Sequence, residues 1–218
     1  MTTSEPTITP TENGPYRLDD GAEVTRMRDG AALPVEGAAH LCRCGGSSNK
    51  PFCDGTHARN GFSGAKDPDR VPDQGESYSS NDGRITIHDN RGLCAHAGRC
   101  TDNLASVFRL RTEPFVDPDG ATADEIAEVI SMCPSGALSY TLDGVDHRDR
   151  NDHSSVAYAP GGPYVVTRVN LAGVEMLEGA TTDHCTLCRC GASQNKPFCS
   201  GAHWNVDFDE DLKQDPEA

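Results

Sequence analysis

The clearest alternation of apolar and polar residues lies in the middle of the chain. Ile85 and Ile87 alternate with polar neighbours, which predicts a strand. A helix is expected to begin at the capping box formed by Thr122 and Glu125 and to end before Pro134. The apolar face of that helix is formed by Ile126, Val129, Ile130 and Cys133. Cys133 is therefore predicted to point inward at the helix end.

Shorter patterns complete this middle segment. Leu104, Val107 and Phe108 recur at helical spacing, and residues 137–142 have the composition of a strand. The predicted order for residues 81–144 is β–α–(β)–α–β, which is half of a ferredoxin-like fold. The fold class expected for the whole chain is α+β.

An internal repeat flanks the middle segment. LCRCGGSSNKPFCDGTH at residues 41–57 matches LCRCGASQNKPFCSGAH at residues 187–203, at a constant offset of 146 residues. A GPY triplet precedes each copy, ending at Tyr16 and Tyr164. The repeat predicts three modules, at residues 14–65, 81–144 and 160–208. Polar, turn-rich linkers are expected at residues 63–80 and 145–160.

Composition restricts the kind of protein. Hydrophobic residues make up only 35% of the chain, which is little for one large core, so metals or disulfides are expected to stabilise small modules. A formal charge of −15 argues against nucleic acid as a partner. No signal peptide or membrane-length apolar run is found, so we expect a cytoplasmic protein without a membrane contact. Reduced cytoplasmic thiols favour metal ligands over a disulfide framework.

The repeated segment contains the pattern C-x-C-x8-C-x3-H. Its residues are Cys42, Cys44, Cys53 and His57 in the first copy, and Cys188, Cys190, Cys199 and His203 in the second. Three cysteines and a histidine placed alike twice indicate a metal site. Structural zinc sites favour longer spacing of the first pair, whereas a 2Fe–2S cluster accepts histidine on one iron. Cys42 and Cys44 could share one iron, with Cys53 and His57 on the other, and zinc is the alternative.

These residues resemble the signature of the CDGSH iron–sulfur (NEET) family, C-x-C-x2-(S/T)-x3-P-x-C-D-G-(S/A/T)-H. The first copy matches throughout, and the second departs once, at Ser200 in place of Asp. The resemblance implies a 2Fe–2S cluster with three cysteines and one exposed histidine per copy. It also implies small β-rich modules paired about a two-fold axis. Here the two copies are expected to pair within one chain rather than through an obligate homodimer.

Residues around the third cysteine of each copy suggest how the site is built. Asp54 and Ser200 are expected to cap a short helix that carries the histidine. Lys50 and Lys196 are candidates for tuning the reduction potential, with a solvated surface charge as the alternative.

The middle segment has cysteines of its own. Cys94 and Cys100 precede Cys133-Pro134, and Ala97 stands where ferredoxins place a second cysteine. This spacing resembles single-cluster ferredoxins and the divergent 4Fe–4S mono-cluster domain. Three thiolates suffice for a 3Fe–4S cluster, whereas a 4Fe–4S cluster needs a fourth ligand such as His96 or water. The tenth cysteine, Cys185, is either a spare ligand during assembly or incidental.

The sequence predicts an electron carrier rather than an enzyme. No catalytic triad order, phosphate loop or dinucleotide fingerprint is found. Several clusters in one small acidic chain suit transfer of single electrons between a reductase and an acceptor enzyme, which the acidic middle module would dock. A second hypothesis is cluster transfer or redox and pH sensing, based on the protonatable histidines. A zinc-binding scaffold is the third.

Overall fold

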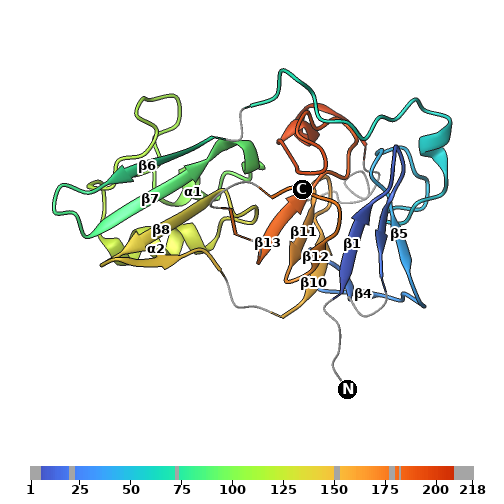
Figure 1. Cartoon of the computed structure of the whole chain (residues 1–218), viewed down its shortest axis with the longest axis horizontal. Coiled ribbons are helices and arrows are strands. Elements are labelled where there is room, and N and C mark those ends of the chain that lie inside the picture. Colours follow the sequence, from blue (N-terminus) through green and yellow to red (C-terminus); the bar gives the residue numbers. More distant parts are fainter. Residues whose placement is uncertain are drawn as a thin grey trace.

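The computed structural model describes residues 6–19, 23–71, 74–149, 153–176, 180–181 and 183–208. Within these ranges the chain is mostly β, with three small sheets and a few short helices (Figure 1). The prediction of β-rich repeats is confirmed. No helix in the described part of the chain is long and apolar enough to cross a bilayer.

The first sheet combines strands from both repeats. Its order is β12-β1-β2-β5. The strands are β12 (Asn170–Leu171), β1 (Thr7–Pro10), β2 (Tyr16–Leu18) and β5 (Ala39–Leu41). β12 comes from the second repeat and pairs parallel with β1, which precedes the first repeat and pairs with its strand β2. The first repeat therefore depends on the second to complete its sheet.

The second sheet shows the reciprocal exchange. Its order is β13-β11-β10-β3-β4. The strands are β13 (His184–Leu187), β11 (Tyr164–Thr167), β10 (Ser155–Tyr158), β3 (Val24–Arg26) and β4 (Ala32–Leu33). β3 belongs to the first repeat and pairs parallel with β10, which precedes the second repeat and pairs with its strand β11. Each exchanged strand covers a sheet edge that would otherwise expose unpaired backbone groups.

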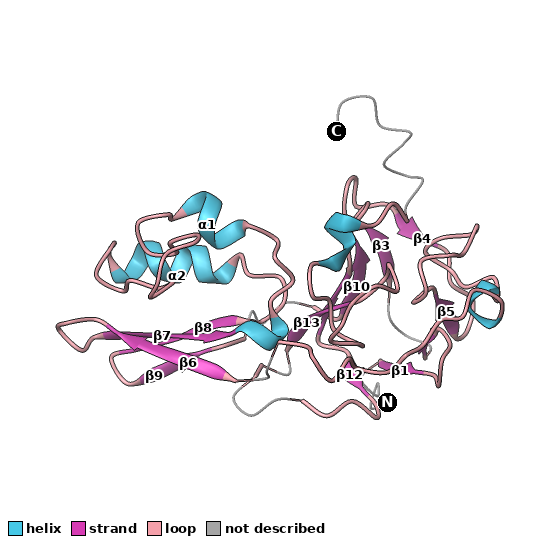
Figure 2. Ribbon diagram, turned by 90° about the horizontal axis from the view of Figure 1, so that it is seen from above, coloured by secondary structure: helices cyan, strands magenta, loops and turns pink. Residues whose placement is uncertain are grey.

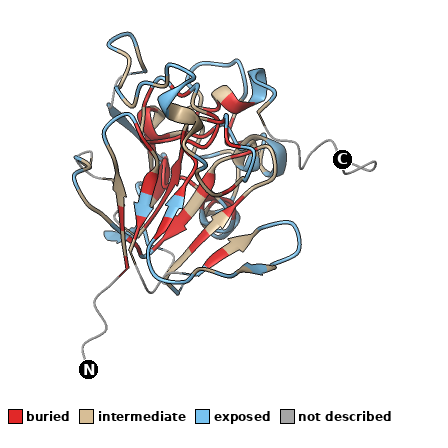
Figure 3. Cartoon of the chain, turned by 90° about the vertical axis from the view of Figure 1, so that its right-hand side faces the viewer, coloured by how far each residue is buried: buried red, intermediate tan, exposed pale blue. Residues whose placement is uncertain are grey.

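One apolar core lies between these two sheets. It contains residues of both repeats, among them the fully buried Leu41 and Leu187 at equivalent positions. Tyr16 and Tyr164 meet edge to face in this core, with their ring centroids 5.9 Å apart. The buried residues gather at the centre of the molecule (Figure 3). The repeats therefore fold as one unit, because neither has a separate core.

The middle segment forms the third sheet, in the order β6-β7-β8-β9. Its strands are β6 (Gly75–Ser79), β7 (Ile85–Asn90), β8 (Leu138–Leu142) and β9 (Val145–His147). The strands predicted near Ile85 and over 137–142 are confirmed as β7 and β8. All neighbouring pairs are antiparallel.

Two helices cover one face of this sheet (Figure 2). They are α1 (Arg99–Asn103) and α2 (Ala123–Ser131). The predicted capping box is present, because the Thr122 and Glu125 side chains each accept from the backbone of the other. The apolar face of α2 is buried in a second core with β7 and β8. A short 3₁₀ helix, η2 (Arg91–Leu93), leads from β7 to the first cysteine.

The middle segment differs from its predicted order. The chain runs β–β–α–α–β–β, and between the helices only an isolated bridge joins Phe108 to Val116. The helical spacing of Leu104 and Phe108 was misleading, since α1 ends at Asn103 and the next residues turn into the core. The expected linkers also contain strands, because β6 pairs with β7 and β10 places Val156 in the repeat core.

Candidate metal centres

The predicted ligands form three groups. The first repeat site comprises Cys42, Cys44, Cys53 and His57. The second repeat site comprises Cys188, Cys190, Cys199 and His203. The middle site comprises Cys94, Cys100 and Cys133.

The first repeat site is built at the end of β5. A backbone bridge between Leu41 and Phe52 folds the loop back, so that Cys42 and Cys53 leave neighbouring backbone positions. Gly55, with φ of 85°, then starts the 3₁₀ helix η1 (Thr56–Ala58), which carries His57. A residue with a Cβ rarely adopts that φ, which explains glycine here.

The predicted ligands of the first repeat site form two close pairs. The Cys42 and Cys44 Sγ atoms are 3.9 Å apart, and the Cys53 Sγ atom lies 3.3 Å from His57 Nδ1. Two ligands on one tetrahedral metal, each about 2.0–2.3 Å from it, are separated by roughly 3.5–3.8 Å. Both separations lie close to that range, so each pair can share one metal, and Nδ1 is the histidine nitrogen turned toward the site.

The second repeat site has the same geometry. Cys188 and Cys190 are 3.9 Å apart at Sγ, and Cys199 Sγ lies 3.3 Å from His203 Nδ1. The bridge between Leu187 and Phe198 and the 3₁₀ helix η3 (Ala202–Asn205) reproduce the first loop. No set of three or more such side chains in the described ranges is arranged around a single ion. The spacing within each pair is compatible with two metals, each held by one pair.

Backbone amides point at the sulfur atoms of both sites. Gly55 N–H donates to Cys53 Sγ at 3.4 Å, and Gly201 N–H donates to Cys199 Sγ at the same distance. Ala192 N–H donates to Cys190 Sγ at 3.5 Å. Such donors stabilise thiolate charge, so the surroundings of the sulfur atoms also fit a negatively charged cluster.

The expected helix cap is wrong in detail. Glycine, not Asp54 or Ser200, occupies the N-cap, and neither short helix has a side-chain bond there. The Asp54 carboxylate instead accepts from the backbone N–H groups of Ser48 and Thr56, at 2.9 and 3.0 Å. The Ser48 N–H bond and the hydroxyl and amide of Thr56 hold the pKa of Asp54 well below its usual range. Asp54 therefore ties the two halves of the first loop together.

The equivalent lysines of the two repeats, Lys50 and Lys196, fold back onto their own loops. Lys50 Nζ donates to Ser47 O at 2.5 Å, and Lys196 Nζ donates to Ser193 O at 2.7 Å. Both cations are thereby held beside the ligand loops. Their influence on a reduction potential stays a prediction.

Each ligand loop is supported by a tyrosine of the other repeat. The Tyr16 hydroxyl donates to Cys188 O at 3.0 Å and to Pro197 O at 2.9 Å. Tyr164 makes the equivalent bonds to the Cys42 loop, at 2.9 and 2.8 Å. Sequence reasoning missed this role, although the repeated GPY triplet that ends in each tyrosine was its signal.

The two repeat sites touch each other. Gly45 and Gly191 both have positive φ, and each lies against the backbone of the other site. A Cβ on Gly45 would overlap Cys190 O, and one on Gly191 would lie 2.6 Å from Cys44 O. Only glycine allows the two ligand loops to approach this closely.

The middle site gathers three cysteines from different elements. Cys94 follows η2, Cys100 lies in α1, and Cys133 follows α2, as predicted for that helix end. All three line one cavity of about 240 Å³, together with Ala97 and the apolar Phe115. Burial, with the neighbouring thiols of Cys94 and Cys133, raises the pKa of Cys100 to about 11. Metal binding would displace protons from such thiols.

His96 lies between the middle site and the second repeat site. It lines the middle cavity, has φ of 53°, and its ring packs on Gly201. A Cβ on Gly201 would be 2.8 Å from His96 Nδ1. The indole N–H of Trp204 donates to His96 O at 3.2 Å. Nothing in the local sequence pattern signalled this contact.

The repeat sites differ in exposure. Cys53 and His57 are half-buried, whereas Cys199 and His203 are buried. The expectation of an exposed histidine in each copy is therefore wrong for His203. The physical reason is that the middle segment covers the second repeat site. Burial, followed by the charge of Arg189, lowers the pKa of His203.

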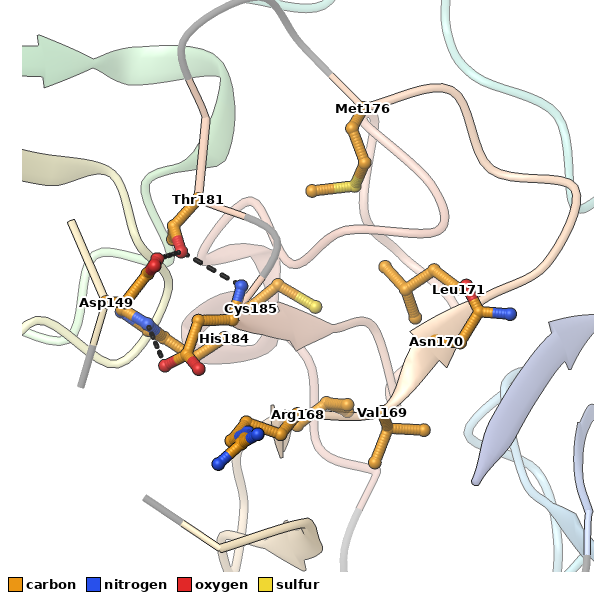
Figure 4. A pocket seen from close by; sticks show the side chains of 11 residues that line it. Asp149, Arg168, Val169, Asn170, Leu171, Met176, Thr181, His184 and Cys185 are labelled. Atoms are coloured by element: carbon orange, nitrogen blue, oxygen red, sulfur yellow. Dashed lines mark hydrogen bonds and ion pairs between the residues drawn. The ribbon is translucent and has the colours of Figure 1, made fainter. Parts of the chain in front are cut away.

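Cys185 lies in β13, in the apolar core shared by the repeats. It also faces a cavity of about 340 Å³ lined by Arg168, Met176, Thr181 and His184 (Figure 4). Burial raises the pKa of its thiol to about 12. This environment is that of a packed core thiol, which agrees with the incidental alternative.

Comparison with known proteins gives matches to two families. The model described as "Iron-binding zinc finger CDGSH type" matches residues 13–58 and 161–204. The model described as "Divergent 4Fe-4S mono-cluster" matches residues 80–143. Similar proteins include "Uncharacterized protein YjdI" of Escherichia coli strains K12 and O157:H7, each 35% identical over 57 residues, which are 26% of this chain and 75% of the relative.

Proposed function

Because this chain belongs to the CDGSH iron–sulfur proteins, with a divergent 4Fe–4S mono-cluster domain between its two CDGSH modules, we propose that it is an electron carrier. It passes single electrons between a reductase and an acceptor enzyme and is not itself an enzyme. The observation that carries the proposal is the direct contact of the two repeat sites through Gly45 and Gly191. Electron tunnelling falls steeply with distance, so adjoining redox sites suit a relay.

We assign the ligands as follows. Cys42 and Cys44 hold one iron of a 2Fe–2S cluster, and Cys53 with His57 holds the other. Cys188 and Cys190, then Cys199 with His203, hold the second such cluster in the same way. Cys94, Cys100 and Cys133 hold a 3Fe–4S or 4Fe–4S cluster. These clusters supply one-electron redox chemistry, and the 3.9 and 3.3 Å ligand pairs support the assignment at both repeat sites.

The chain's own residues prepare the sites for this role. Amide donors at Gly55 and Gly201 stabilise sulfur charge. Burial of Cys199 and His203 excludes water from the second repeat site. Because these groups are already fixed by backbone geometry, little reorganisation accompanies a change of charge.

The two CDGSH modules pair about a pseudo-two-fold axis within one chain. The reciprocal strand exchange and the reciprocal bonds of Tyr16 and Tyr164 support this proposal. An obligate homodimer is then unnecessary. Light scattering during gel filtration should give the mass of one chain, 23.3 kDa.

Redox partners have an apolar groove to dock in. It lies over the second repeat site and the middle site, and its cavity includes His203 and Pro134. Four exposed apolar side chains line it: Met27 at 49%, Met132 at 37%, Trp204 at 69% and Val206 at 36% exposure. Brief redox complexes use such small interfaces, and the −15 charge favours a basic partner. A cytoplasmic location fits ten cysteines none of which is paired in a disulfide in the described part of the chain.

Reduction of the purified protein tests the carrier function. Anaerobic protein is analysed for iron and acid-labile sulfide, titrated to defined potentials and followed by EPR. Reversible one-electron steps within the range of cellular donors are expected for each cluster. Turnover with a ferredoxin reductase and a haem acceptor would add support. If no cluster is reduced within that range, the proposal is refuted.

Cluster transfer is the second candidate function, favoured by the half-buried Cys53 and His57 at the first repeat site. An open, histidine-ligated site can release its cluster to an acceptor. His57→Cys should then block transfer to an apo-acceptor while electron transfer persists. His203→Cys is the matched control, because its site is covered.

A further inference from the structure

In the described part of the chain, the cysteine loop of the middle segment packs on the ligand loop of the second repeat. Gly92 O accepts from the Asn195 side chain, and Leu93 is buried in the repeat core. His96 packs on Gly201, beside the second repeat site. Two parts of the loop around Cys94 are thus attached to the ligand loop of the second repeat, and Leu93 between them packs in the core that both repeats share.

The equivalent positions of the first repeat lack these contacts. Asn49, which corresponds to Asn195, is exposed, whereas Asn195 is buried. A Cβ on Gly55, which corresponds to Gly201, would have nothing within 4 Å. Ala58 stands where the second repeat has Trp204. Each position of the second repeat that contacts the middle segment can therefore be compared with an equivalent position of the first repeat that does not.

We propose that electrons pass between the middle site and the first repeat site only through the second repeat site. The contact of His96 with Gly201 fixes how closely the middle site approaches the second repeat site. This inference rests on the proposed carrier function. One electron lost at the middle site is gained at the second repeat site, which then loses it to the first. A one-electron flavoprotein donor and a metalloprotein acceptor balance the sequence.

The His96 ring is a positioning group. Its left-handed backbone and the Trp204 bond fix the loop, and the missing Cβ of Gly201 lets the ring reach the backbone beside Cys199. The His96–Gly201 contact thus joins the middle site to the second repeat site, and the contact at Gly45 and Gly191 joins the second repeat site to the first. The three sites therefore form an unbranched series with the second repeat site in the middle.

EPR of the fully reduced, full-length protein tests the order. Cys53→Ala leaves the second repeat cluster as the CDGSH signal, and Cys199→Ala leaves the first. Because the reduced middle cluster is paramagnetic, a nearby signal is broadened and saturates at higher microwave power. We expect broadening and higher half-saturation power in Cys53→Ala, and a narrow, easily saturated signal in Cys199→Ala. Adding Cys100→Ala, which removes the middle cluster, should abolish the difference.

Hydrogen exchange tests the contact without reduction. Gly201→Ala and Gly55→Ala both place a Cβ at positive φ, but only the first meets His96. Amide exchange around residues 92–98 should rise several-fold in Gly201→Ala and stay unchanged in Gly55→Ala. Equal saturation in the two reduced variants, or equal exchange in the two glycine variants, overturns the inference. Failure of every cluster to accept an electron overturns the carrier function instead.

Discussion

Removing one hydroxyl from one repeat should destabilise the site of the other. Tyr16 is fully buried, and its hydroxyl donates to the carbonyl oxygens of Cys188 and Pro197 at 3.0 and 2.9 Å. Tyr16→Phe keeps the ring and its contact with Tyr164 but removes this donor. Pro197 O keeps its bond from Cys188 N–H, whereas Cys188 O loses the bond from Tyr16. A buried hydrogen-bonding group left unpaired costs about 1–3 kcal/mol, so we expect a loss of about 2 kcal/mol. That corresponds to a fall of roughly 4–8 °C in melting temperature for a chain of this size.

The assay is the rate at which iron is released to a chelator, followed by visible absorbance. If the whole loss of about 2 kcal/mol favours opening of the second ligand loop, release from that site rises by up to about 30-fold. Tyr164→Phe should have the same effect on the first repeat site, because its hydroxyl supports the Cys42 loop. EPR of each variant identifies which cluster is lost.

Tyr140→Phe is the matched control. Its ring stacks on His147 in the middle sheet, away from the repeat sites, so release should not change. The reasoning is refuted if Tyr16→Phe accelerates loss from the first repeat site only, or leaves both rates at the wild-type value.

Three further predictions follow from individual residues. Gly45→Ala should lower the melting temperature far more than Gly37→Ala, because both share positive φ but only Gly45 lies against another backbone; similar melting curves would contradict this. Burial raises the pKa of Asp89 to about 6. The folded state then binds that proton more tightly than the unfolded chain, so stability falls by up to about 3 kcal/mol as pH rises from about 4 to about 6. Urea unfolding across that pH range measures it, and Asp89→Asn should flatten the profile. A chelator should remove iron from the first repeat site faster than from the second, as EPR of each cluster can follow. His57→Cys should slow release from the first repeat site and His203→Cys should leave that rate unchanged; equal release from the two repeat sites would show that exposure does not control it.

Local sequence patterns predicted which side chains lie together at the repeat sites. The spacing of Cys42 and Cys44 places both sulfur atoms on one short loop, and the x3 spacing turns His57 back toward Cys53. The capping box at Thr122 likewise predicted where α2 begins. These features depend on backbone geometry over a few residues, which periodicity and motif spacing describe directly.

Patterns failed where a strand or turn depends on a distant partner. β6 is polar and mostly exposed, and it is a strand because it pairs with β7. Phe108 has helical spacing from Leu104, yet the chain forms a turn there, and this turn buries the Phe108 side chain against the middle sheet. In both cases tertiary contacts decided the local conformation.

The amino-acid sequence by itself determined which residues are the candidate ligands and that they occur twice, because four ligands within 16 residues are brought together by local chain geometry. Only the tertiary structure decided that the repeats exchange strands and that one repeat site is buried while the other is partly open. Those outcomes depend on contacts such as His96 with Gly201, between residues more than a hundred positions apart. Similar local motifs therefore acquire different surroundings, since burial is set by what packs against a site and not only by its own sequence.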